Sequence, residues 1–152
     1  ATVRPRWQPE RRRRRGRAAA MNIVPASTGA AIAVTLAIPE LEGKFDGVSL
    51  RVPTISGSIA DITFIAGRDT SAEEINNIFR AAAQEERYKG LLRVEEDQVV
   101  SGDIIGDSHV AIVDLNFTKV IGNLVKLTVW YDNEAGYSNA MVRQVERIGR
   151  TL

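Results

Sequence analysis

The residues of this sequence that could bind a ligand are a Thr-Gly pair, an arginine and an asparagine. Thr28-Gly29 lies just before a run that predicts a helix, where free backbone N–H groups and the positive end of the helix dipole attract a phosphate. Glycine lets the backbone approach the anion, and the hydroxyl of Thr28 adds a donor. Arg51 can hold a phosphate with two parallel hydrogen bonds, and Asn133 carries the donor and the acceptor that match a carboxamide.

Each of these residues also has a purely structural interpretation. A Thr-Gly pair ahead of a helix caps that helix far more often than it binds an anion, and asparagine is itself a favoured N-cap. A single arginine is usually a surface residue. Tyr137, one turn beyond Asn133, fits the apolar stripe of a helix as well as a ligand site. The residue pattern therefore leaves both interpretations open at every one of these positions.

The composition excludes several kinds of site. The chain has 152 residues, of which 44% are hydrophobic and 26% are charged, with no cysteine and one histidine. Disulfides, thiolate metal sites, a cysteine nucleophile and a histidine metal cluster are therefore excluded within these residues. No apolar run approaches the roughly 18–20 residues of a membrane span, and no secretory signal core follows the basic start. We expect a cytoplasmic protein without a metal site.

The charge is distributed very unevenly along the chain. Residues 1–17 contain eight arginines and one glutamate, a local charge of +7, whereas residues 18–152 contain 12 basic and 18 acidic residues. The consecutive arginines from Arg11 to Arg15 repel one another, so we expect a disordered arm over residues 1–17 and a folded domain over residues 18–152. Such an arm could bind nucleic acid or another polyanion without sequence specificity.

The periodicity of the apolar residues predicts the elements of the folded part. Helices are expected over residues 29–38, from about residue 71 to a few residues before Gly90, and over 134–147; strands are expected over residues 48–52, 57–65, 91–94, 98–100, 110–113 and 124–131. Thr70 with Glu73 and Ser71 with Glu74 both satisfy the capping-box spacing, which places the start of the second helix to within one residue. This order is not strict βαβ alternation and indicates an α+β domain, a mainly antiparallel sheet with helices packed on one face.

Two of these elements predict buried faces. In the strand over residues 124–131, one side is wholly apolar and is expected to face the core; it consists of Val125, Leu127, Val129 and Tyr131. In the last helix, apolar residues recur at helical spacing and form a single stripe; they are Tyr137, Met141, Val145 and Ile148.

Three segments of the sequence resemble the phosphorylating glyceraldehyde-3-phosphate dehydrogenases. Arg17–Ala31 is similar to the segment that ends in a phosphate-binding Thr-Gly, and Leu50–Thr54 to the strand end whose arginine contacts the substrate phosphate. Trp130–Asn139 is similar to the segment whose asparagine holds the carboxamide of nicotinamide. Their order and spacing, and the run Glu95–Ser101, also fit, so the resemblance covers about residues 14–150, the C-terminal part of the family's catalytic domain.

The resemblance implies two sets of ligand contacts. The phosphate contacts are Thr28, Gly29, Arg51 and Arg15, of which Arg15 matches a further anion-binding arginine in an Arg-Arg-x-Arg run; the contacts to the cofactor, NAD or NADP, are Asn133 and Tyr137. The implied partners are glyceraldehyde 3-phosphate, inorganic phosphate and further copies of the chain, since the family forms tetramers.

The resemblance also implies that the reacting groups lie outside these residues. The family uses a cysteine nucleophile and a histidine base, and its cofactor occupies a dinucleotide-binding fold with a G-x-G-x-x-G turn. Ala1–Val3 resembles the start of the strand that carries the histidine, but Arg4 follows. His109 lies well downstream, and we interpret it as a structural or solvated loop histidine.

No residue of the chain is therefore assigned a catalytic role. We expect an inactive fragment of a glyceraldehyde-3-phosphate dehydrogenase that uses NAD or NADP together with the dinucleotide-binding domain. The alternatives are a fragment of an erythrose-4-phosphate dehydrogenase, whose substrate presents the same phosphate, and a non-catalytic protein that assembles with complete subunits or binds polyanions through its arm.

Overall fold

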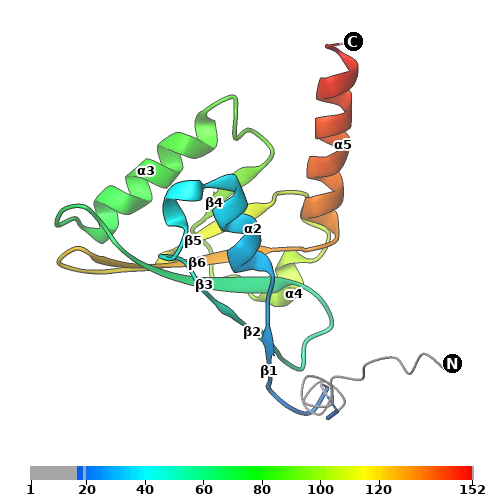
Figure 1. Ribbon diagram of the computed structural model, residues 1–152, viewed down its shortest axis with the longest axis horizontal. Helices are drawn as coiled ribbons and strands as arrows, with labels where there is room; N and C mark the ends of the chain where they lie inside the picture. Colours follow the sequence, from blue (N-terminus) through cyan, green and yellow to red (C-terminus); the bar gives the residue numbers. More distant parts are fainter. Residues whose placement is uncertain (1–16, 19, 152) are drawn as a thin grey trace, which may run out of the picture. The chain divides into compact units, whose positions relative to one another are not determined.

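The computed structural model describes residues 17–18 and 20–151 (Figure 1). The predicted arm and the candidate ligand Arg15 therefore lie outside the described residues, except for Arg17 at the end of the arm, which is exposed. The chain divides into two compact units, Ala1–Ile55 and Ser56–Leu152, and each contains its own sheet.

The first unit contains a two-stranded antiparallel ribbon and a short helix. Strand β1 (Val24–Ser27) pairs with β2 (Val48–Arg51), and helix α2 (Ala30–Ala37) and the 3₁₀ helix η1 (Pro39–Leu41) come between them in sequence. The predicted helix over residues 29–38 and strand over residues 48–52 are thus confirmed to within one residue. Helix α2 ends at Ala37 because a proline disfavours helical geometry in the residue before it; Ile38 accordingly has a φ of −132°.

Strand β1 is an element that the sequence pattern does not predict. Its four residues, Val24-Pro-Ala-Ser, show no alternation of apolar and polar side chains, and Pro25 lacks a backbone N–H. Proline is nevertheless compatible with an edge strand, and β1 pairs with only one neighbour. The strand forms because β2 supplies its hydrogen-bonding partners.

The second unit is built on a four-stranded sheet with the strand order β3-β6-β5-β4. The strands are β3 (Ser58–Ile65), β4 (Leu92–Glu95), β5 (Ala111–Ile121) and β6 (Leu124–Tyr131). Both pairings of β6 are antiparallel, and β4 pairs with β5 in parallel. Together with the helices this confirms the predicted α+β class with a mainly antiparallel sheet.

The helices of this unit are α3 (Ala72–Gln84), the short α4 (Ser101–Ile104) and α5 (Ala135–Gly149). Helix α3 packs against β4 and β5, and α4 contacts β6. The predicted start of α3 is confirmed, since Oγ of Ser71 accepts a hydrogen bond of 3.1 Å from the backbone N–H of Glu74. Among the described residues, none of the helices combines the length and the apolar character needed to cross a bilayer.

The predicted strand over residues 98–100 is wrong. The backbone N–H of Val100 donates to the carboxylate of Asp103 at 2.8 Å, which starts helix α4 instead of a strand ladder. The strand expected over residues 110–113 is correct in type but continues to Ile121. The register shifts between Asp114 and Lys119, and this irregularity hides the alternation that would have predicted the longer strand.

The core of the second unit lies between the sheet and its helices. Its most buried apolar side chains come from β5, β6 and α4; they are Ile104, Ile112, Val113, Leu115, Val125 and Leu127. The apolar face predicted for β6 is therefore confirmed at Val125 and Leu127, whereas Val129 and Tyr131 are half-buried.

The apolar stripe of α5 is exposed. Its exposed fractions are 68% for Tyr137, 51% for Met141, 65% for Val145 and 49% for Ile148. In Figure 1, α5 leaves the end of β6 and projects away from the sheet. The helix is confirmed, but the interpretation of Tyr137 as a core residue of the described chain is wrong.

Candidate functional site

The candidate phosphate residues Thr28 and Gly29 link strand β1 to helix α2. The backbone N–H of Ala30 donates to Oγ1 of Thr28 at 3.1 Å, so Thr28 does help to cap the helix. A hydroxyl that accepts this bond keeps its own proton for donation, and a role as a phosphate donor is compatible with the cap. The first turn of α2 contains no acidic residue, so no carboxylate opposes the positive end of the helix.

Gly29 is not required by the fold. Its backbone angles, φ −85° and ψ 0°, are accessible to residues with a side chain. A Cβ atom added to Gly29 would have no heavy atom within 4 Å. Neither backbone conformation nor packing against the described residues therefore accounts for glycine at this position, whereas the approach of a ligand to the backbone would.

Arg51 lies at the other end of the ribbon. It is the last residue of β2, is exposed, and pairs with Val24, whereas Thr28 follows Ser27, which pairs with Val48. Four residue positions separate the two ends, or about 13 Å at the usual rise of a strand. The ribbon thus does not bring Arg51 and Thr28 together, although both belong to the same unit.

The candidate cofactor residue Asn133 lies two residues beyond the end of strand β6. Its side chain is exposed, and its Oδ1 accepts a hydrogen bond of 3.0 Å from the hydroxyl of Ser58. Its other predicted role, as the N-cap of α5, is wrong, because the neighbouring Asp132 caps this helix. The backbone N–H groups of Glu134 and Ala135 both donate to Oδ1 of Asp132 at 2.9 Å.

Asp132 is a structural residue that the sequence pattern does not single out. It is 5% exposed, and its Oδ2 accepts a third bond, of 2.9 Å, from the backbone N–H of Gly106. The hydrogen bonds from Gly106, Ala135 and Glu134 hold the pKa of Asp132 below its ordinary value, against the opposing effect of burial. An Asp just before a helix is a recognised capping signal, but Asn133 offers the same signal one residue later.

The first turn of α5 rests on the loop that precedes β5. Gly136 is buried, and a Cβ atom added to it would lie 2.7 Å from the carbonyl oxygen of His109. Nδ2 of Asn139 donates to the carbonyl oxygen of Ser108 at 3.0 Å. Glycine at position 136 is therefore needed for close contact between the helix and the loop, and this contact fixes the backbone near Asn133.

His109 belongs to a network of charged side chains. Its Nδ1 lies 2.7 Å from Oδ1 of Asp107, whose Oδ2 accepts from Nε of Arg93 at 3.0 Å. Partial burial acts to raise the pKa of Asp107, but the hydrogen bonds from His109 and Arg93 outweigh it and leave the pKa below its ordinary value. The interpretation of His109 as a satisfied loop histidine is confirmed.

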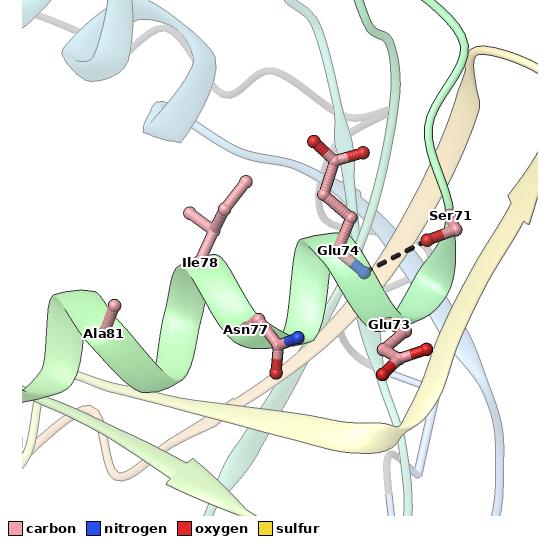
Figure 2. Close-up of a pocket in the computed structure, with 6 residues that line it drawn as sticks. All are labelled: Ser71, Glu73, Glu74, Asn77, Ile78 and Ala81. Atoms are coloured by element: carbon pink, nitrogen blue, oxygen red, sulfur yellow. Dashed lines mark hydrogen bonds between the residues drawn. The ribbon is translucent and has the colours of Figure 1, made fainter.

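A shallow surface pocket along α3 contains none of the predicted site residues. It is lined by Ser71, Glu73, Glu74, Asn77, Ile78 and Ala81 (Figure 2). The hydrogen bond between Ser71 and the backbone of Glu74 belongs to the helix cap, and the two glutamates would repel a phosphate. No group of His, Cys, Asp or Glu side chains in the described ranges is arranged to hold a metal ion.

Comparison with known proteins gives consistent matches. Residues 3–133 match the family described as glyceraldehyde 3-phosphate dehydrogenase, C-terminal domain. The chain is 50% identical over 144 residues to the glyceraldehyde-3-phosphate dehydrogenase of Mycobacterium avium, a stretch that covers 95% of this chain and 42% of that protein. It is 47% identical over 140 residues to the enzyme of the same name from Zymomonas mobilis subsp. mobilis, covering 91% of this chain and 42% of that protein. The chain thus spans less than half the length of these curated relatives.

Proposed function

Because the chain belongs to the glyceraldehyde-3-phosphate dehydrogenase family, as a C-terminal domain, we propose that it supplies the phosphate and nicotinamide contacts of an NAD- or NADP-dependent oxidoreductase. The complete enzyme would oxidise and phosphorylate glyceraldehyde 3-phosphate, a reaction of glycolysis in the cytoplasm, and would act as a homotetramer. Residues 1–17 would form its basic arm and residues 18–152 its partial catalytic domain.

The phosphate role proposed for Thr28 and Gly29 depends on the presence of glycine at position 29. A glycine that neither its backbone angles nor its surroundings demand stands at the start of α2, where backbone N–H groups attract an anion. The hydroxyl of Thr28 lies beside it. We assign these two residues to one phosphate group.

Arg51 serves a second anionic position. The ribbon separates it from Thr28 by about 13 Å at the usual rise of a strand, and its exposed guanidinium can grip a phosphate in a forked manner. The proposed reaction uses two phosphates, one on the aldehyde and one inorganic, which suits two separate positions. Arg15 is proposed as a further phosphate contact from its place in the sequence alone.

Asn133 contacts the carboxamide of the nicotinamide. Its side chain is exposed at the end of β6, and an amide pairs with a carboxamide through complementary donors and acceptors. Tyr137 is 68% exposed one turn into α5, and we propose that its ring covers the nicotinamide rather than packing in the core.

Replacement of Gly29 by valine is expected to weaken phosphate binding about tenfold or more, the equivalent of one lost charged hydrogen bond. The side chain would stand in the path of the anion, whereas its Cβ atom would contact none of the described residues, so the melting temperature should not fall. Isothermal titration of the 152-residue chain with inorganic phosphate measures the affinity.

Gly47 provides the matched control for this experiment. It lies in the same unit, and a Cβ atom there also has no heavy atom within 4 Å, but it is not at the start of a helix. Gly47→Val should bind phosphate like the unmodified chain. Equal phosphate affinity in Gly29→Val and Gly47→Val would refute the assignment.

The 152-residue chain is expected to show no dehydrogenase activity by itself. The family's chemistry depends on a cysteine thiolate, and this sequence contains no cysteine, so intact phosphate contacts cannot produce turnover. The measurement is NADH formation from glyceraldehyde 3-phosphate, phosphate and NAD, with a complete family member as the positive control. Phosphate-dependent NADH formation by the purified chain would show that a different nucleophile operates.

A further inference from the structure

Ser58 makes a hydrogen bond that determines how the amide of Asn133 is turned. The hydroxyl of Ser58 donates to Oδ1 of Asn133 at 3.0 Å. The terminal rotation of an asparagine side chain is broad and has two opposite orientations. A donor on one side of the amide favours the orientation in which the oxygen faces that donor and the nitrogen faces away.

The strand register brings these two residues together although they are 75 positions apart in sequence. Ser58, the first residue of β3, pairs with Tyr131, the last residue of β6, and Asn133 follows two residues later. Asn133 lies in the turn just beyond this pair, where its amide is within reach of the hydroxyl of Ser58. The hydroxyl is thus presented by a sheet strand and not by a mobile loop.

The start of β3 is itself held in place by Gly57. This residue has a φ of +83°, and an added Cβ atom would lie 2.9 Å from the backbone oxygen of Ser101. Glycine accepts such a backbone conformation without strain. The position of Ser58 is therefore set by close backbone contact directly before it.

The backbone on either side of Asn133 is also fixed. Asp132 accepts bonds from the backbone N–H groups of Glu134 and Ala135, and the backbone N–H of Gly136 donates to the carbonyl oxygen of Asp132 at 3.0 Å. With its backbone held in this way, the main remaining freedom of Asn133 is in its side chain, which Ser58 restricts.

We propose that Ser58 is a positioning residue for the nicotinamide site. It acts through Asn133: by occupying Oδ1 it turns the two N–H groups of Nδ2 outward, so that they donate to the carboxamide oxygen of the cofactor. This inference rests on the proposed contact between Asn133 and nicotinamide. It adds the second residue on which that contact depends and the atom of the carboxamide that is recognised.

The test is a titration of the ¹⁵N-labelled 152-residue chain with nicotinamide mononucleotide, followed through the side-chain amide signals of Asn133. Ser58→Ala is expected to bind about fivefold more weakly, as for the loss of one ordinary hydrogen bond. Ser58→Thr keeps a hydroxyl and suits a strand position, so it should restore the affinity of the unmodified chain. If the role of Ser58 were only structural, Ser58→Ala and Ser58→Thr of equal thermal stability would bind the mononucleotide with equal affinity.

The outcomes distinguish the inference from the proposed function. If the unmodified chain binds the mononucleotide with a response at Asn133 and Ser58→Ala binds equally well, the positioning role is overturned and the proposed cofactor contact stands. If the signals of Asn133 in the unmodified chain do not respond, the proposed contact is overturned, and the inference with it. Should Ser58→Ala fail to fold, Ser58→Cys, of similar size but with a weak donor, is measured in its place against the same expectation.

Discussion

Gly136→Ala is expected to destabilise the chain by about 2–3 kcal/mol, as for an overpacked buried site. In most helices this substitution stabilises, because alanine is the better helix former by up to about 1 kcal/mol. Here the new Cβ atom would lie 2.7 Å from the carbonyl oxygen of His109 and 3.3 Å from Cα of Val110. Both contacts are with backbone atoms, so α5 must move away from the loop.

Gly149 in the same helix is the matched control. A Cβ atom there would have no heavy atom within 4 Å, and Gly149→Ala should leave the free energy of unfolding unchanged or raise it slightly. Urea unfolding followed by tryptophan fluorescence measures both variants. Two variants of equal stability would show that the contact between α5 and the loop is not tight.

Asp114→Ala is expected to lower the free energy of unfolding by about 3 kcal/mol, because it removes the charged acceptor of two hydrogen bonds. Asp114 on β5 is 1% exposed. Its Oδ2 accepts from the indole N–H of Trp130 at 3.0 Å, and its Oδ1 accepts from the backbone N–H of Asn116 at 3.1 Å.

Asp61 is the control for this variant, because it occupies the equivalent position on the other side of β6. Asp61 and Asp114 both pair with Thr128, but the side chain of Asp61 is 61% exposed and forms an ion pair with Lys126 at 2.8 Å. Such surface pairs contribute about 0–1 kcal/mol, so Asp61→Ala should change stability little. If both variants lost a similar free energy of unfolding, the burial of Asp114 would contribute nothing to stability.

Both variants change residues that hold the chain segment around the candidate site residue Asn133. Gly136 and Asp132 hold the first turn of α5, and Trp130 precedes Asn133 by three residues on the same strand and turn. Structural residues of the second unit thus determine where Asn133 is presented. We expect Gly136→Ala to weaken the proposed contact between Asn133 and the cofactor as well as the fold.

The sequence by itself determined the elements whose signals are local. Helix α3 was predictable because capping-box pairs precede an apolar stripe, and β6 because every second residue from Val125 to Tyr131 is apolar. The start of helix α2 directly after Thr28 and Gly29 was predictable for the same reason, since a helix start is a local feature. Resemblance to known segments then identified the family, which the comparisons confirm.

Only the tertiary structure decided the features that depend on partners distant in sequence. Strand β1 exists through pairing with β2, and Asp132 was recognisable as the cap of α5 and a partner of Gly106 only when the loop and the helix were seen together. Likewise Ser58 meets Asn133 only through the register of β3 on β6. A single sequence shows periodicity and spacing within an element, but hydrogen bonds across 26 or 75 residues follow from the packing of the whole unit. The tertiary structure therefore shows that the side-chain amide of Asn133 is held by the hydroxyl of Ser58.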